Sequence, residues 1–169
     1  VEPIWKDEDC ISVRVRAQEL GLELGDGLSV LPRWFETAPS PQRMVHEAEV
    51  VSLLKLWRQA GVDVQIVSPQ LGLLRENAST WIMPTLFVAS SLMTGNPALV
   101  SVALGVVSNY LTDLFRGVAD PNTVKASVVV EKRDGTCRRI SYEGPVRGLE
   151  KIESLVKEAF KEDGDREGL

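Results

Sequence analysis

The sequence predicts an α/β protein in which a small mixed sheet, ending in a C-terminal β-hairpin, packs on helices that include an apolar helical hairpin. Three observations predict it. Apolar residues alternate with polar ones in several short segments, they recur at helical spacing in others, and one long central segment carries no charge. The chain has 169 residues, of which 44% are hydrophobic. This is enough for one globular domain over residues 1–160, followed by a frayed charged tail over 161–169.

The first part of the chain predicts strands. Ile11–Ala17 alternates apolar and polar side chains, as a half-buried strand does. The alternation changes phase beyond residue 19, which requires a bulge or the end of the strand. Gly25-Asp26-Gly27 then predicts a turn, with Leu28–Leu31 as a short return strand of a hairpin.

A proline-rich loop, a helix and another strand come next. Residues 32–41 hold three prolines together with Trp34 and Phe35, so we expect a loop with apolar anchors. Ser40-Pro41 suits a helix entry, since serine can cap and proline is tolerated at the first helical position. The helix would continue to Ala60 and stop at Gly61, and a second strand would follow over 62–67.

The central segment from Asn77 to Thr112 contains no charged side chain. It is interrupted by Gly95-Asn96-Pro97, which can be read as a helix stop, an N-cap and a first helical position in succession. We therefore predict a helical hairpin with arms at Met83–Thr94 and Pro97–Arg116, closed by Gly117. Pro84 would delay the start of the first arm by a residue.

The C-terminal part predicts a hairpin and a helix. Val124–Glu131 and Cys137–Glu143 are strands around an Asp134-Gly135 turn. A three-residue loop with Gly135 in the left-handed region places Val128 opposite Ile140, and it groups the apolar side chains, whereas a two-residue loop would mix them with polar ones. A last helix follows, whose apolar stripe consists of Leu149, Ile152, Leu155, Val156, Ala159 and Phe160.

Composition excludes several function classes. The chain carries 19 basic and 24 acidic residues, a net charge of -5, which argues against nucleic-acid binding because that needs clustered cations. Cys10 and Cys137 form no CxxC motif and predict two reduced thiols in a cytoplasmic protein. With a single histidine, His46, the sequence predicts no metal site and no cofactor.

Catalytic motifs are weak. His46-Glu47-Ala48-Glu49 resembles the start of HExxH, but Val50 stands where the second histidine would be, so we expect a solvated helix face. Neither a phosphate-binding glycine loop nor a GxSxG nucleophile motif occurs, and we predict no catalytic residue. The alternative is a small-molecule-binding protein or an enzyme whose site is assembled from scattered polar residues, of which Glu47, Glu49, Asn109 and Asp113 come first.

A cluster of basic residues offers a second binding hypothesis. Seven of them could share the exposed face of the sheet and attract an anionic partner, although charges on a strand face more often keep a sheet edge from pairing with another chain. These residues are Arg14, Arg16, Lys125, Lys132, Arg133, Arg138 and Arg139.

The second arm of the predicted helical hairpin carries a stripe of small residues at steps of three or four: Ala98, Ser101, Gly105, Ser108 and Thr112. Small side chains let helix backbones approach closely, in a bilayer or in dense soluble packing. The first arm is too short for the ~20 residues that span a bilayer, and the second is marginal. We therefore expect a homo-oligomer or protein interface that uses Ser101, Gly105 and Ser108, with membrane contact as the alternative. An exposed Trp34–Phe35 pair would mark a further interface.

The order of these elements resembles the effector-associated constant component family of prokaryotic conflict systems. The shared features are an amphipathic helix with a Trp near its end between two strands, small-residue-rich apolar helices, a hairpin with a central Asp-Gly, and a terminal helix. The resemblance implies a non-enzymatic adaptor or membrane-proximal sensor that recruits or restrains an effector. Gln18–Pro39 and the strongly apolar hairpin depart from the family pattern. The residues that carry the resemblance cover about half the chain: Ile11–Val15, Leu53–Trp57, Val62–Val67, Ala103–Phe115 and Val128–Ile140.

Overall fold

The computed structural model describes residues 2–74, 80–117 and 123–167, with side chains up to Lys161. Its centre is a mixed seven-stranded sheet in the order β1-β9-β8-β7-β2-β4, with β6 also paired to β8. The predicted α/β class, a mixed sheet with a C-terminal hairpin packed on helices, is confirmed. The strands of this sheet are β1 (Ile4–Cys10), β2 (Leu28–Leu31), β4 (Val64–Ile66), β6 (Thr80–Ile82), β7 (Thr85–Val88), β8 (Thr123–Glu131) and β9 (Cys137–Gly144).

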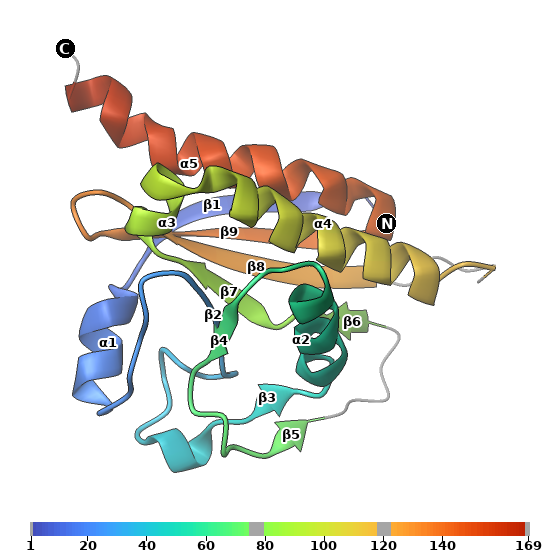
Figure 1. The fold of residues 1–169 in the computed structure, drawn as a ribbon, viewed down its shortest axis with the longest axis horizontal. Coiled ribbons are helices and arrows are strands. Elements are labelled where there is room, and N and C mark those ends of the chain that lie inside the picture. The colour runs from blue at the N-terminus through green and yellow to red at the C-terminus, as the bar shows by residue number, and fades with distance from the viewer. Residues whose placement is uncertain (1, 75–79, 118–122, 168–169) are drawn as a thin grey trace.

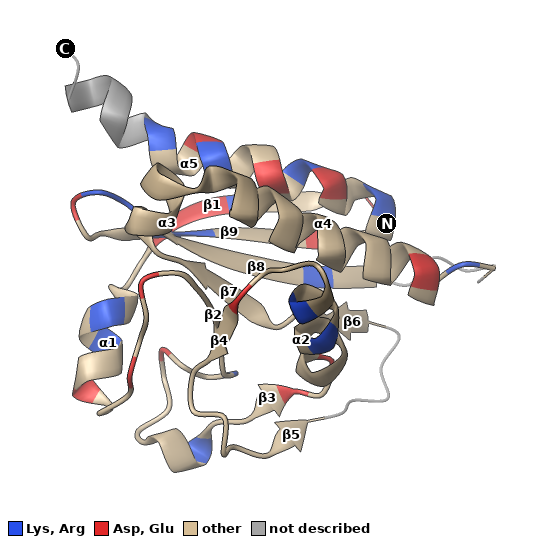
Figure 2. Cartoon of the chain, viewed as in Figure 1, with Lys and Arg blue, Asp and Glu red and all other residues tan. Residues whose placement is uncertain are grey.

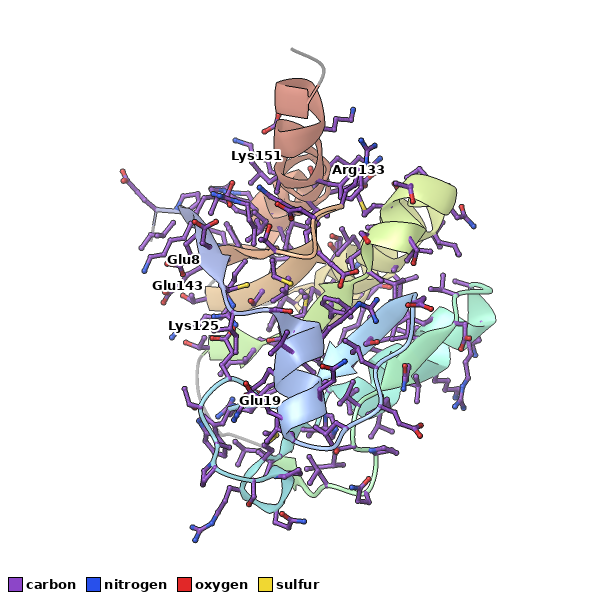
Figure 3. The ribbon with its side chains drawn as sticks, turned by 90° about the vertical axis from the view of Figure 1, so that its left-hand side faces the viewer. Glu8, Glu19, Lys125, Arg133, Glu143 and Lys151 are labelled. Atoms are coloured by element: carbon purple, nitrogen blue, oxygen red, sulfur yellow. The ribbon has the colours of Figure 1, made fainter. Side chains whose placement is uncertain are left out.

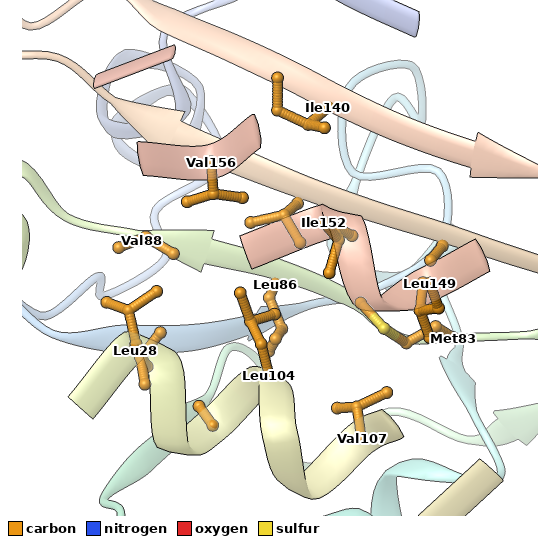
Figure 4. Close-up of a cluster of buried hydrophobic side chains, with 14 of the residues drawn as sticks. Leu28, Met83, Leu86, Val88, Leu104, Val107, Ile140, Leu149, Ile152 and Val156 are labelled. Atoms are coloured by element: carbon orange, nitrogen blue, oxygen red, sulfur yellow. The ribbon is translucent and has the colours of Figure 1, made fainter. Parts of the chain in front are cut away.

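Helices cover the two faces of the sheet unequally. On one face lie α2 (Val50–Gln59), α4 (Pro97–Leu114) and α5 (Ile152–Glu167), with the 3-10 turn Val146–Lys151 between β9 and α5 (Figure 1). The larger core fills the space between these helices and the sheet (Figure 4). The other face is covered by α1 (Val13–Glu19) and the loop after β2, over a smaller core around Phe35, Phe87 and Val129.

The prediction of a strand over Ile11–Ala17 is wrong. Residues 13–19 form α1, in which the Ser12 hydroxyl accepts a hydrogen bond from the Val15 amide as an N-cap. Val13 and Ala17, four residues apart, are buried, whereas Val15 is 53% exposed. The alternation extends over only seven residues, and over so short a segment a helix that buries every fourth residue gives the same pattern.

The actual first strand, β1, precedes this helix and was not predicted. Its sequence is rich in charge because it forms the edge of the sheet and, among the described strands, pairs with β9 alone. Asp7 and Asp9 are neutralised by Arg138 across the ladder, at 2.7 and 2.9 Å. Trp5 points to the larger core, with its ring 4.4 Å from that of Tyr142.

The predicted strand over residues 28–31 is confirmed as β2, but its partners differ from the prediction. It pairs with β7 and β4 in the middle of the sheet and forms no hairpin with residues 11–17. All four of its residues are buried. The strand predicted over 62–67 is β4, parallel to β2.

The helix predicted to start at Ser40-Pro41 starts later. Pro41–Arg43 is a single 3-10 turn, and the Ser40 side chain caps nothing. The chain then forms β3 (His46–Glu47), which pairs with β5 (Leu73–Leu74), before α2 begins at Val50. The end of α2 is as predicted, because Gly61 follows with φ +78°.

The first arm of the predicted helical hairpin, Met83–Thr94, is wrong, whereas the second is confirmed as α4. Residues 85–88 form β7, a central strand that is buried on both sides. Leu86 and Val88 enter the larger core, and Phe87 enters the smaller one. A doubly buried strand has the continuous apolar sequence of a buried helix, so periodicity does not separate them. Only Ser90–Gly95 is helical, as the short α3.

The C-terminal hairpin has the predicted three-residue register. Val128 faces Ile140, Ala126 faces Tyr142, and Gly135 has φ +88°. The predicted apolar stripe of the last helix is confirmed: Leu149, in the preceding 3-10 turn, Ile152, Val156, Ala159 and Phe160 are buried, and Leu155 is partly buried. The α5 backbone continues to Glu167, and the side chains of the predicted frayed tail beyond Lys161 lie outside the described residues.

Gly135→Ala should lower the free energy of unfolding by about 1 kcal/mol, because a residue with a Cβ is strained at this positive φ. Gly27→Ala is the matched control, since Gly27 lies outside the left-handed region and its Cβ would meet open space. Urea denaturation measures both. Equal effects of the two substitutions would contradict the assigned turn.

Candidate functional site

Helix α4 has one packed side and one open side. The packed side inserts Val100, Ala103, Leu104, Val107 and Leu111 into the larger core. The indole Nε1 of Trp57 donates a hydrogen bond to the Ala103 carbonyl oxygen at 3.1 Å, which fixes α2 against α4.

The open side of α4 is formed by small and apolar residues. Only 28% of the residues of the helix are buried, and Val102 is 43% exposed. A Cβ built on Gly105 would have no heavy atom within 4 Å, so this glycine is not required for packing inside the chain. Ala98 and Thr112 are exposed, and Ser108 is half-buried. The predicted small stripe is therefore exposed at Ala98 and Thr112 and half-buried at its other positions, so another molecule can reach part of it.

Ser101 is the member of the stripe that contacts another element. Its hydroxyl donates a hydrogen bond to the Glu153 carboxylate on α5, and this bond, with a second from Lys157, lowers the pKa of Glu153. Figure 2 shows α4 in tan along most of its length, between the charged residues of α5 and those of α2. The open side of α4 is thus a neutral strip with charged borders.

A groove of about 530 Å³ runs between α2 and α4. Val106, Asn109, Tyr110 and Asp113 line its α4 side, and Ser52, Lys55, Leu56 and Gln59 line its α2 side. The Tyr110 hydroxyl donates a hydrogen bond to Glu49 Oε2 at 2.7 Å. Of the four residues suggested for an assembled site, Asn109 and Asp113 line this groove, and Glu49 reaches it through Tyr110.

Glu47, the fourth of these residues, lies elsewhere. Its carboxylate accepts a hydrogen bond from Arg33 Nε at 2.6 Å, on the other side of the sheet. The four polar residues are therefore not brought together into one site.

The predicted solvated helix face at His46 is wrong. His46 lies on β3 and is 2% exposed, and its Nε2 lies 2.8 Å from the Val67 carbonyl oxygen and 3.1 Å from that of Ser68. Because carbonyl oxygens only accept, Nε2 carries the proton. The ring holds the segment after β4 in place, which is a structural role.

Trp34 and Phe35 have different environments. Phe35 is 4% exposed and anchors its loop in the smaller core, where its carbonyl accepts a hydrogen bond from Arg16 Nε at 2.9 Å. Trp34 is 50% exposed at φ +66°, with the Arg33 guanidinium 5.8 Å from its ring centre. The predicted interface pair therefore supplies a single exposed aromatic, on the sheet face opposite to α4.

That opposite face is open between the Trp34 loop and the β1 edge. A groove of about 340 Å³ lies there, lined by Lys6 and Glu8 of β1, by Lys125 and Ser127 of β8, and by Arg139 and Ser141 of β9. A second groove, about 330 Å³, shares Arg139 with it and continues to Trp34.

Five of the seven basic residues that could have formed an anion site pair with carboxylates: Arg14, Arg16, Lys125, Arg138 and Arg139. Arg138 binds Asp7 and Asp9, Arg139 binds Glu36, and Lys125 lies 3.9 Å from Glu143, beside it in Figure 3. Arg16 donates to two carbonyls of the Trp34 loop, and Arg133 lies 5.2 Å from the Phe160 ring. This pairing gives the sheet face a mixed charge instead of a cationic patch.

A partly buried ion pair joins α1 to the end of β8. Arg14 Nε donates to Glu131 Oε2 at 2.6 Å, and the Ser90 amide and hydroxyl donate to Oε1 at 3.0 and 3.1 Å. Burial raises the pKa of Glu131, but the hydrogen bonds from Arg14 and Ser90 outweigh it and hold this pKa below its usual range. Sequence reasoning missed this pair, since it depends on residues 117 positions apart.

Comparison with known protein families, with curated proteins and with solved structures found no match to this chain. Among the described residues, no three His, Cys, Asp or Glu side chains lie close enough together to hold a metal ion. By length and composition, α4 is the one described helix that could span a membrane.

Proposed function

We propose that this protein is a non-enzymatic interaction module that binds a second copy of itself through the open side of α4. The observation that carries the proposal is the combination of sequence and exposure on this helix. From Pro97 to Thr112 it is uncharged, yet the described residues of the chain leave its outer side uncovered. Its exposed surface is uncharged and includes Val102, and this supports its use as an interaction site.

A second copy suits this surface because the surface is self-complementary. In a two-fold symmetric dimer each patch meets itself, so a charge on the patch would face its own like charge. The neutral strip avoids this repulsion. Small side chains at Ala98, Gly105 and Ser108 let two α4 backbones approach, while Val102 supplies apolar contact.

The borders of the strip favour protein over lipid as the covering surface. Lys55 of α2 lies on one side of α4, and Glu153 and Lys157 of α5 on the other. Insertion of α4 into a bilayer would carry these charges toward the hydrocarbon, which is costly. In a dimer they form the polar rim that protein interfaces have.

Self-association leaves the Trp34 side of the sheet free. We place the adaptor contact, with an effector of the kind that the family resemblance implies, on that side of a cytoplasmic dimer. Trp34 is the exposed aromatic there, and aromatic side chains are enriched at such contacts.

Gly105→Leu is expected to convert the dimer to a monomer. Within one chain the leucine points into open space and is a better helix former than glycine, so the monomer stays folded. Across two chains it separates the helices. Light scattering without detergent measures the mass, and circular dichroism confirms the fold.

Val102→Glu should act in the same way, since it puts a charge into the contact. Val15→Glu is the matched control, because Val15 is 53% exposed on α1, on the other face of the sheet. A wild-type mass of one chain, or an unchanged dimer in both α4 variants, would overturn the proposal. Flotation of the wild type with liposomes would instead assign α4 to lipid.

A further inference from the structure

The sheet brings together the two cysteines that the sequence places near opposite ends of the chain. Cys10, the last residue of β1, is the register partner of Cys137, the first residue of β9. Both side chains belong to the smaller core, where Cys137 is 2% exposed and Cys10 is half-buried. Directly opposed residues of an antiparallel pair project to the same side of the sheet.

The backbone spacing fits a disulfide. Opposed residues in antiparallel strands have Cα atoms about 4.5 or 5.5 Å apart, and a disulfide requires about 4.4–6.8 Å. A bond between these two sulfur atoms therefore needs little movement of β1 against β9. The two thiols already contact each other, because the Cys10 thiol donates a hydrogen bond to the Cys137 sulfur.

The surroundings favour a thiolate on Cys137. The hydrogen bond from Cys10 lowers the pKa of Cys137, and a hydrogen bond from the Val13 amide and the nearby Arg14 guanidinium lower it further against the effect of burial. The same thiol–thiol bond and burial raise the pKa of Cys10. The buried sulfur is thus the better nucleophile, and the half-buried one is the one that solvent reaches.

We propose that Cys10 and Cys137 form a thiol–disulfide exchange site that reacts with a low-molecular-weight disulfide and closes into a disulfide within the chain. The half-buried position of Cys10 gives a small oxidant access to its thiol, on the face of the sheet that also carries the groove lined by Lys6, Glu8 and Arg139.

The exchange takes two steps. Cys10 passes its proton along the thiol–thiol hydrogen bond to the Cys137 sulfur and attacks the small disulfide. A bond forms between Cys10 and one of its sulfurs, and the other sulfur leaves and takes up the proton from Cys137 as a thiol. Cys137 then attacks the Cys10 sulfur and expels the second small thiol. Both cysteines are oxidised, the small disulfide is reduced by two electrons to two thiols, and the two cysteine protons end on those thiols.

The disulfide would stabilise the pairing of the edge strand β1 with β9. In the part of the chain that the structure describes, β1 pairs with β9 alone and is the first strand of the sheet. A disulfide at residues 10 and 137 cross-links the end of β1 to the hairpin, so the oxidised protein resists unfolding and fraying of this edge more than the reduced one.

The test incubates the reduced, full-length protein with oxidised glutathione. The expected product has lost about 2 Da, the two hydrogens of the thiols, contains no free thiol and migrates faster on a non-reducing gel. Its melting temperature should rise by roughly 5–15 °C and return after reduction.

Two variants assign the order of attack. Cys137→Ser should stop at a glutathione adduct on Cys10, whereas Cys10→Ser should leave Cys137 unmodified until the protein is denatured. A substitution at the buried Cys137 can disturb folding. Circular dichroism therefore checks the fold of Cys137→Ser, and Cys137→Ala is measured beside it. Free thiols in the folded wild type after incubation, a disulfide between two chains, or faster modification of Cys137 than of Cys10 would each overturn the proposal.

Discussion

Trp57→Ala should lower the free energy of unfolding by about 3–5 kcal/mol, the largest effect expected of any substitution discussed here. Trp57 is 0% exposed and lies between α2 and α4. Alanine leaves a cavity under the helix that carries the proposed interface, and it leaves the Ala103 carbonyl without its hydrogen bond from the indole. Chemical denaturation by urea measures the loss.

Two further variants show which interactions of Trp57 account for the loss of stability. Trp57→Phe keeps most of the volume but loses the hydrogen bond, so it should cost less than alanine. Trp34→Ala removes a tryptophan that is 50% exposed and should change stability by less than 1 kcal/mol, about the scale of surface substitutions. A cost at Trp57 no larger than at Trp34 would contradict the packing of α2 on α4.

Glu131→Ala should lower the free energy of unfolding by about 2–3 kcal/mol. It leaves Arg14 without its buried partner and removes the acceptor for the Ser90 amide and hydroxyl. The value lies at the lower end for a broken buried pair because the Arg14 side chain is 33% exposed, and water can partly solvate it. Asp26→Ala is the control, since Asp26 also pairs with Arg14 but is 84% exposed, and its loss should cost little.

The same ion pair predicts a pH dependence of stability. The pKa of Glu131 is lower in the folded chain than its ordinary value of 4.5. The stabilising contribution is therefore complete above pH 4.5 and is lost as the pH falls through the folded-state pKa. The difference in unfolding free energy between wild type and Glu131→Gln should be constant near neutral pH and shrink below 4.5. A difference that grows on acidification would contradict the assigned pair.

The elements with strong local signals could be predicted from sequence. Pro97 suits the first position of α4, and Gly61 and Gly135 have a positive φ that few other residues adopt, so these residues fix boundaries and register locally. The elements that were predicted wrongly lack such signals. Val13–Glu19 is too short for its periodicity to separate strand from helix, and Thr85–Val88 is apolar on both sides because helices and loops cover both faces of the central strand.

The candidate sites likewise differ in how far the sequence predicts them. The small stripe on α4 could be found from spacing alone, because one helix carries all of it. That it faces outward depends on which side of α4 the sheet covers, and this is set by long-range packing. The cysteine pair could not be predicted from sequence, because it forms only when β1 pairs with β9 at the sheet edge. The charged sequence of β1 gave no signal for a strand.

The most direct test of the central claim is photo-crosslinking from a diazirine-bearing aliphatic side chain placed at position 102, where valine has similar volume. After irradiation of the pure protein without detergent, peptide mass spectrometry locates the product. The α4 dimer predicts a covalent link between position 102 and residues 97–112 of a second chain. Reaction with solvent alone, or a link to any surface other than α4 of another copy, would contradict it.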